Sequence, residues 1–235
     1  MAFRTRTPVP VPPCTPPGAK ARARPLGTIT SVRKFFKNLL GMDYREKIEA
    51  IRENEILKCR NNIEYFIDNY GHIEDKDADE LIQPFKMWKE QREALQSVMA
   101  HKMNVILKAR QLGISWLVVH VAAHTLLSPG KTVIGLSKTE EEAKELVRRL
   151  KMVFTWCPEL IADKEFLPAN WKGLTFKATA LTLTVYYPNG KESVFKGLAS
   201  SPGAGRSFTA NLIIFDEWAF QQFATEIWQA GFPTI

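Results

Sequence analysis

Short apolar runs alternate with amphipathic helical stretches in this chain, and that alternation constrains its fold more than any other feature. Residues 104–108, 132–137 and 212–215 have the length and the apolar content of buried strands. Residues 115–127 and 139–154, which follow the first two runs, carry apolar side chains at helical spacing. Strands that alternate with helices predict right-handed crossovers and a mainly parallel sheet with flanking helices, so the predicted fold class is α/β.

Two further stretches complete the predicted architecture. Residues 181–187 and 193–198 flank Asn189-Gly190, a pair that is typical of a type I′ turn. We therefore expect an antiparallel pair of strands, either inserted into the sheet or added at its edge. Apolar residues between positions 29 and about 70 fall at roughly helical intervals and predict one to three helices ahead of the core.

The first 30 residues differ in composition from the rest. They hold seven of the fourteen prolines and no acidic residue, so they bury too little apolar surface to offset the entropy of ordering. We expect a flexible basic tail. The predicted domain organisation is this tail over residues 1–30, a helical lead-in over 31–80 and the α/β domain over 81–235.

Charge and cysteine usage add weaker constraints. The net charge is +7, but most of it comes from five cations in the tail, so basicity alone is poor evidence for a DNA-binding face. These cations are Arg4, Arg6, Lys20, Arg22 and Arg24. Cys14, Cys59 and Cys157 lack the spacing of a zinc site or a redox pair, and we expect no disulfide. No apolar run approaches the roughly 20 residues that span a bilayer, so we expect an intracellular protein without a membrane segment.

The residues LKARQLGIS, Leu107–Ser115, connect a predicted strand to a predicted helix. A loop at this place presents successive backbone N–H groups and the positive end of the helix dipole to phosphate oxygens. Gly113 permits a close approach of the backbone, and Ser115 stands where the hydroxyl of a P-loop binds Mg²⁺. The alternative is an ordinary strand-to-helix turn with solvated basic side chains.

This loop departs from the common pattern G-x-x-x-x-G-K-[ST] at two positions. Lys108 replaces the first glycine, and Ile114 replaces the lysine. Because Ile114 cannot bind phosphate, a cation must come from elsewhere, and Lys108 or Arg110 can project into the same space. We expect a variant of the P-loop fold of RecA-like nucleoside triphosphatases.

Asp216 and Glu217 follow the apolar run 212–215, at the carboxyl end of a predicted strand, where open α/β sheets bind ligands. Asp216 is expected to hold Mg²⁺ through a water molecule, and Glu217 to position and polarise the water that attacks a γ-phosphate. The alternative is a strand that ends in two solvated acids. A phosphate-loop sequence about 100 residues upstream favours the catalytic interpretation.

With these motifs placed, the sequence resembles the large terminase subunits of tailed bacteriophages from about Asn61 to Ile235. Four segments carry the resemblance. They are NNIEYFIDNYGHI (61–73), similar to the family's lead-in helix; PFKMWKEQREAL (84–95), similar to its adenine-binding segment; KARQLGIS (108–115), similar to its variant P-loop; and GAGRSFTANLIIFDEWAF (203–220), similar to its Walker B region.

The resemblance implies a role for each segment in binding ATP. Gln91 is implied to read adenine through its amide, with Phe85 or Trp88 stacked on the base, although both aromatic residues also suit an amphipathic helix. Family members with the lysine displaced to the start of the loop match Lys108, which makes it the first choice for the β- and γ-phosphates and Arg110 the second. The other implied nucleotide-binding residues are Ala109, Gln111, Leu112, Gly113, Ile114 and Ser115.

Two interpretations exist for each of two single residues and one histidine pair. Arg206 lies in a loop eleven residues before Glu217, similar to the arginine finger proposed for some terminases, and equally suits a loop arginine that binds DNA or phosphate in its own subunit. Ser137 is expected to cap the helix that follows it, in preference to contacting DNA. His120 and His124 lie four apart on a helix but lack the glutamate of an H-E-x-x-H pattern, so no metal site is expected there.

The resemblance implies an ATPase motor that uses ATP and Mg²⁺ to drive double-stranded viral DNA into the prohead. Its implied partners are the portal protein, the terminase small subunit and further copies of itself in a ring. It would act in the host cell cytoplasm, on the prohead, and be absent from the mature virion. The family's nuclease follows the carboxylates and lies outside this chain, so no nuclease activity is expected. The alternatives are a helicase-like ATPase and a truncated nucleotide-binding module without turnover.

Overall fold

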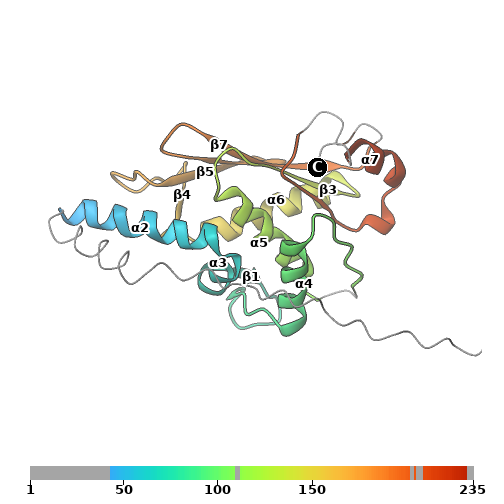
Figure 1. Ribbon diagram of the computed structural model, residues 1–235, viewed down its shortest axis with the longest axis horizontal. Helices are drawn as coiled ribbons and strands as arrows, with labels where there is room; N and C mark the ends of the chain where they lie inside the picture. Colours follow the sequence, from blue (N-terminus) through green and yellow to red (C-terminus); the bar gives the residue numbers. More distant parts are fainter. Residues whose placement is uncertain (1–42, 109–111, 202–203, 205–208, 232–235) are drawn as a thin grey trace, which may run out of the picture. The chain divides into compact units, whose positions relative to one another are not determined.

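Six strands form one sheet, and five of them run in the same direction. The computed structural model describes residues 43–108, 112–201, 204 and 209–231. The order across the sheet is β4 (Ile161–Asp163), β5 (Leu174–Ala178), β6 (Thr182–Tyr186), β7 (Glu192–Ala199), β3 (Thr132–Ser137) and β8 (Leu212–Phe215). Among these strands only β6 is antiparallel to its neighbours. The predicted α/β class with a mainly parallel sheet is confirmed (Figure 1).

Helices cover both faces of the sheet around β3. They are α5 (Ile114–Leu126), α6 (Glu140–Thr155) and α7 (Ala224–Gly231). Because side chains alternate along a strand, neighbouring residues of β3 point to opposite faces. Val133 joins the core that α5 and α6 share, whereas Ile134 and Leu136 pack in a second cluster with Ile227 of α7.

A smaller group of helices and strands comes before the six-stranded sheet in the sequence and packs on α5. It consists of α2 (Tyr44–Asn61), α3 (Ile63–Tyr70), the antiparallel strands β1 (His72–Glu74) and β2 (Ile82–Pro84), and α4 (Lys89–Ala100). Phe66 and Ile67 of α3 are buried in the core that α5 enters. Arg148 of α6 forms an ion pair with Glu74 of β1. Two helices therefore lie in the part of the predicted lead-in that the structure describes.

The helix cap ahead of α6 differs from the prediction. Ser137 pairs with Ala199 as the last residue of β3, so it remains in the sheet and does not cap the helix. Thr139 takes that position instead. Its hydroxyl accepts from the Glu142 N–H at 3.3 Å, and the Glu142 carboxylate accepts from the Thr139 N–H at 3.1 Å. The two bonds form a capping box, two residues beyond the predicted cap.

The predicted hairpin is present, but its turn type is different. Strands β6 and β7 are antiparallel and lie inside the sheet, between β5 and β3. Gly190 has a φ of 77°, whereas Asn189 is not among the described residues with positive φ, so the type I′ prediction is wrong. The Gly190 N–H donates to the Tyr187 carbonyl at 3.0 Å. Pro188 fixes its own φ near the value of an ordinary turn, and this favours a type I turn followed by a left-handed glycine.

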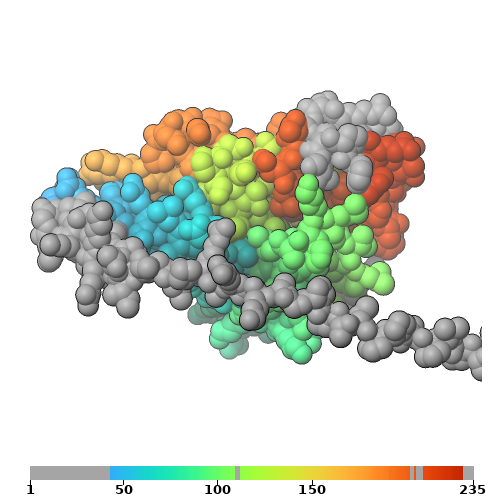
Figure 2. Space-filling view, viewed as in Figure 1, coloured from blue at the N-terminus to red at the C-terminus, as the bar shows by residue number. Residues whose placement is uncertain are grey.

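The strand predicted over residues 104–108 is also absent, since these residues form no strand in the described structure. Val105 is 91% exposed and Leu107 is 100% exposed. An apolar run becomes a strand only where neighbouring strands pair with its N–H and C=O groups and other side chains cover it. No described strand pairs with this segment. Figure 2 shows the green stretch that contains it at the surface.

Within the described residues, no helix is both long enough and apolar enough to cross a membrane. Cys59 and Cys157 are free and buried. Burial raises the pKa of the Cys59 thiol to about 12, so this thiol is protonated near neutral pH.

Candidate functional site

The end of β8 brings two carboxylates to the carboxyl edge of the sheet. The Asp216 N–H donates to the Leu136 carbonyl at 2.9 Å, which extends the pairing of β8 with β3 by one residue. Ile214 packs against the core under α5 and α6, and alternation along the strand places Asp216 on the same face. Asp216 is half-buried and Glu217 is exposed.

Glu217 has an unusual backbone conformation. Its φ of 50° and ψ of 42° lie in the left-handed region, which costs a non-glycine residue about 1 kcal/mol or more. The residue opens a short 3₁₀ helix, η1 (Trp218–Phe220), in which the Phe220 N–H donates to the Glu217 carbonyl at 2.9 Å. The chain turns sharply directly after Asp216, and surrounding contacts must hold this turn.

The end of the predicted phosphate loop leads directly into α5. Gly113 precedes the helix with a φ of 67°, a left-handed conformation that glycine adopts without strain. The first N–H groups of any α-helix lack intrahelical partners, and the helix dipole is positive there, so the start of α5 favours an anion. Ala109, Arg110 and Gln111 lie outside the described residues.

Lys108 and Ser115 meet across this loop. The Lys108 ammonium donates to the Ser115 hydroxyl at 3.3 Å, although seven residues separate them in sequence. Ile114 packs partly against the core, so its side chain does not compete for the place of a cation. A positive charge and a hydroxyl therefore lie together at the start of α5, the helix that contacts β8.

Gln91 connects the first turn of α4 to the same loop. Its side chain is 4% exposed. The amide oxygen accepts from the Trp88 N–H at 2.9 Å, and the amide nitrogen donates to the Leu112 carbonyl at 2.9 Å. A Cβ added to Gly113 would lie 2.7 Å from that nitrogen. One hydrogen and one lone pair of the amide are left for a further partner.

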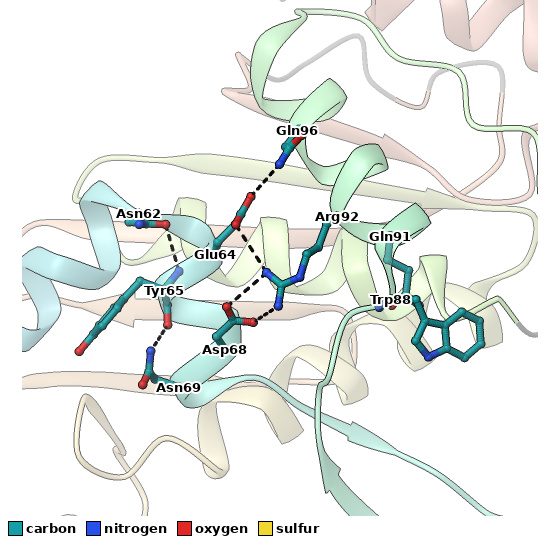
Figure 3. Close-up of polar contacts among 9 residues, drawn as sticks. All are labelled: Asn62, Glu64, Tyr65, Asp68, Asn69, Trp88, Gln91, Arg92 and Gln96. Atoms are coloured by element: carbon teal, nitrogen blue, oxygen red, sulfur yellow. Dashed lines mark hydrogen bonds and ion pairs between the residues drawn. The ribbon is translucent and has the colours of Figure 1, made fainter. Parts of the chain in front are cut away.

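The two aromatic residues predicted to stack on a base lie in different environments. Phe85 is 4% exposed, and its ring centroid lies 5.0 Å from that of His120. Trp88 is 57% exposed at the start of α4, and Figure 3 shows its indole pointing away from the polar contacts of α3 and α4. Of the two rings, only that of Trp88 has a face open to a planar ligand.

A polar network holds α4 against α3 (Figure 3). Arg92 donates to the two carboxylate oxygens of Asp68 at 2.7 and 3.2 Å and to Glu64 at 3.5 Å. Gln96 donates to Glu64 at 3.3 Å. The hydrogen bonds with Asp68 raise the pKa of the Arg92 guanidinium. The network fixes the position of the helix that carries Gln91.

Of the two histidines of α5, His120 is fully buried and His124 is partly buried. The Nδ1 atom of His120 lies 2.7 Å from the Trp116 carbonyl, and the rings of His120 and His124 lie 6.4 and 6.3 Å from the ring of Phe66. Burial lowers the pKa of His120 to about 4 and also lowers the pKa of His124. Both rings are therefore neutral at physiological pH.

Sequence reasoning missed two residues that hold these elements in place. Arg92 finds its partners 24 and 28 residues away, and Gln221 bonds to Leu136, which is 85 residues away. No local pattern marks such contacts, because they depend on how distant elements pack. Arg206 lies outside the described residues.

Comparison with sequence models of protein families gives a match that covers more than half of the chain. A sequence model of the family described as Terminase large subunit, T4likevirus-type, N-terminal, matches residues 105–235, more than half of the chain. The matched part includes Lys108, Ser115, Asp216 and Glu217, and it begins after α4. A search of curated proteins found no match.

Proposed function

Since this chain belongs to the terminase large subunit family of T4likevirus type, a family of phage DNA packaging, we propose that it hydrolyses ATP to drive double-stranded viral DNA into the prohead. The contact between Lys108 and Ser115 carries this proposal, because it brings a cation and a hydroxyl together at the N-terminus of a helix. The carboxylates at the end of β8 support it.

At the phosphate end, Lys108 and the free N–H groups of α5 bind the β- and γ-phosphates. Ser115 and Asp216 offer a hydroxyl and a carboxylate oxygen, which fit the preference of Mg²⁺ for oxygen ligands. When bound, Mg²⁺ supplies positive charge that offsets the negative charge of the phosphates. Glu217 orients and polarises the attacking water.

At the base end, Trp88 stacks on adenine, since its ring is exposed and that of Phe85 is buried. The remaining hydrogen and lone pair of the Gln91 amide suit the paired acceptor and donor on one edge of adenine. The same amide contacts the Leu112 carbonyl, so the Gln91 side chain would contact both the base and the phosphate loop.

The partners implied by the resemblance are part of the proposal. Double-stranded DNA is the substrate that is moved, the portal protein and the small subunit are contacts, and further copies of the chain complete a ring. Arg206 is the candidate for a charge supplied to a neighbouring copy, or else for a phosphate contact within its own subunit.

Phosphate release from ATP tests the proposal, measured with and without Mg²⁺ while ATP binding is followed in parallel. Lys108→Ala is expected to abolish release by weakening binding, and Glu217→Gln to abolish release while ATP still binds. Lys102→Ala and Glu226→Gln are matched controls at exposed positions outside the site and should behave as the unchanged chain. Normal turnover in Lys108→Ala or Glu217→Gln would contradict the proposed role of the substituted residue.

One observation favours a second function, a nucleotide-binding module without turnover. The segment that leads into the phosphate loop, residues 104–108, forms no strand in the described structure, so Lys108 lacks the support that a paired strand would give. Mg²⁺-dependent ATP binding without phosphate release in the unchanged chain would establish this second function in place of the motor.

A further inference from the structure

Gln221 is a buried polar residue at the turn that follows the carboxylates. Its side chain is 7% exposed. The amide nitrogen donates to the Asp216 carbonyl at 3.0 Å and to the Leu136 carbonyl at 3.4 Å. The reverse orientation would point the amide oxygen at two carbonyl oxygens, so the contacts fix the orientation of the amide. One side chain therefore joins the ends of β3 and β8.

The same residue also closes the turn through its backbone. The Gln221 N–H donates to the Trp218 carbonyl at 3.2 Å. Together with its side-chain bond to Asp216, this contact encloses Glu217, whose left-handed backbone is intrinsically unfavourable. A strained conformation persists only where the surrounding structure determines it, and Gln221 supplies hydrogen bonds on both sides of Glu217.

The amide oxygen of Gln221 gives no comparable stabilisation. It is buried and has no hydrogen-bond partner among the residues that the structure describes. A buried, unpaired carbonyl oxygen is unfavourable, so the amide stabilises this turn through its donors alone. A methionine of similar length would fill the space but would leave the carbonyls of Asp216 and Leu136 without these bonds.

We propose that Gln221 is a positioning residue for the hydrolysis, one that holds the turn so that the Glu217 carboxylate stays fixed relative to Asp216. This inference rests on the proposed ATPase function. Gln221 acts through the backbone and lies after the carboxylates, so the variant changes the chemical step and leaves nucleotide binding intact. The expected signature is a fall in kcat with little change in KM.

The test compares Gln221→Met with Gln222→Met, a control at the neighbouring exposed position. Gln221→Met is expected to lower kcat at least about tenfold while KM for ATP changes less than about twofold. Amide hydrogen exchange over residues 216–221 is expected to become about tenfold faster, because one to two net hydrogen bonds are lost. Unchanged kcat together with unchanged exchange would overturn the proposal.

A second variant separates positioning from folding. In Gln221→Glu the new carboxyl group donates a hydrogen bond only while it is protonated. As the pH is lowered, the protection of residues 216–221 from exchange, taken relative to the intrinsic exchange rate at each pH, should therefore rise and kcat should recover. The unchanged chain should show no such recovery. A pH-independent Gln221→Glu variant would overturn the role of the donor. Hydrogen exchange needs no turnover, so a chain that releases no phosphate contradicts the proposed function while exchange still tests Gln221.

Discussion

The burial of His120 makes the stability of the fold depend on pH in a defined direction. The side chain is 0% exposed and packs against Phe85. Burial lowers its pKa from 6.5 to about 4. Between these two values the unfolded chain binds a proton that the folded chain does not bind, so acid favours the unfolded state. The stability is complete above about pH 6.5 and falls as the pH is lowered towards 4.

The size of the effect follows from the two pKa values. A difference of about 2.5 between them corresponds to about 3 kcal/mol, lost in full near pH 4. Between about pH 7 and about pH 5 the expected loss from this one residue is about 2 kcal/mol. The pKa of His124 is lowered for the same reason and adds to the loss with the same sign.

Urea unfolding at about pH 7 and about pH 5 measures this loss through the slope and midpoint of the transition. The comparison is between the unchanged chain and His120→Phe, whose ring cannot bind a proton. His101→Gln, at an exposed position, controls for the removal of a histidine. We expect the unchanged chain and the control to lose about 2 kcal/mol more than His120→Phe. Equal losses in all three proteins would show that the ring of His120 is accessible to protons in the folded state, which would refute the reasoning.

Two glycines give further predictions. Gly113→Ala combines a φ of 67° with a Cβ close to a neighbouring amide, so ATP titration should show weaker binding; unchanged affinity would contradict the close fit at the loop. In Gly135→Ala the new Cβ would lie 2.6 Å from a ring carbon of Phe195, and such overpacking is expected to destabilise the fold by about 1–3 kcal/mol in urea unfolding. A loss below about 0.5 kcal/mol would mean that the ring moves aside freely.

Local sequence patterns predicted the strands and helices that the number and spacing of their own apolar residues mark. The run 132–137 became β3, whose last five residues are buried. The run 212–215 became β8, whose four residues are only partly buried, although its composition had predicted a buried strand. Helix α6 follows its apolar spacing, within one residue of the predicted start and end. Strand β4, of only three residues, was not predicted, because it depends on pairing with β5.

The segment 104–108 shows the limit of the same reasoning. Its composition suits a strand, but the preference of a residue for a strand takes effect only where neighbouring strands and side chains pack against it. In the described structure no neighbour pairs with it, and Leu107 is fully exposed. The outcome depends on contacts between distant parts of a chain, which no local window contains.

The residues of the candidate site also divide into those that the sequence identified and those that only the structure revealed. Sequence motifs named Lys108, Ser115 and Asp216 individually, because each occupies a fixed place relative to a strand or a helix. The choice between Phe85 and Trp88 needed the packing of the core, since Phe85 is buried against His120. The hydrogen bonds of Gln91 with Leu112 and of Gln221 with Leu136 had no local signal, because 21 and 85 residues separate the partners.

Among the described strands, β8 has a neighbour on one side only, and the largely apolar run 103–107 is exposed. Both features bear on how the protein behaves in concentrated solution. Unpaired strand edges and exposed apolar runs are the features through which separate chains stick together. Lys102 and Lys108 flank the run, and their like charges keep two such runs apart. Salt screens that repulsion, since the Debye length falls from about 30 Å at 0.01 M to about 10 Å at 0.1 M. We therefore expect isolated chains to remain dispersed in dilute, low-salt buffer and to self-associate as salt is added.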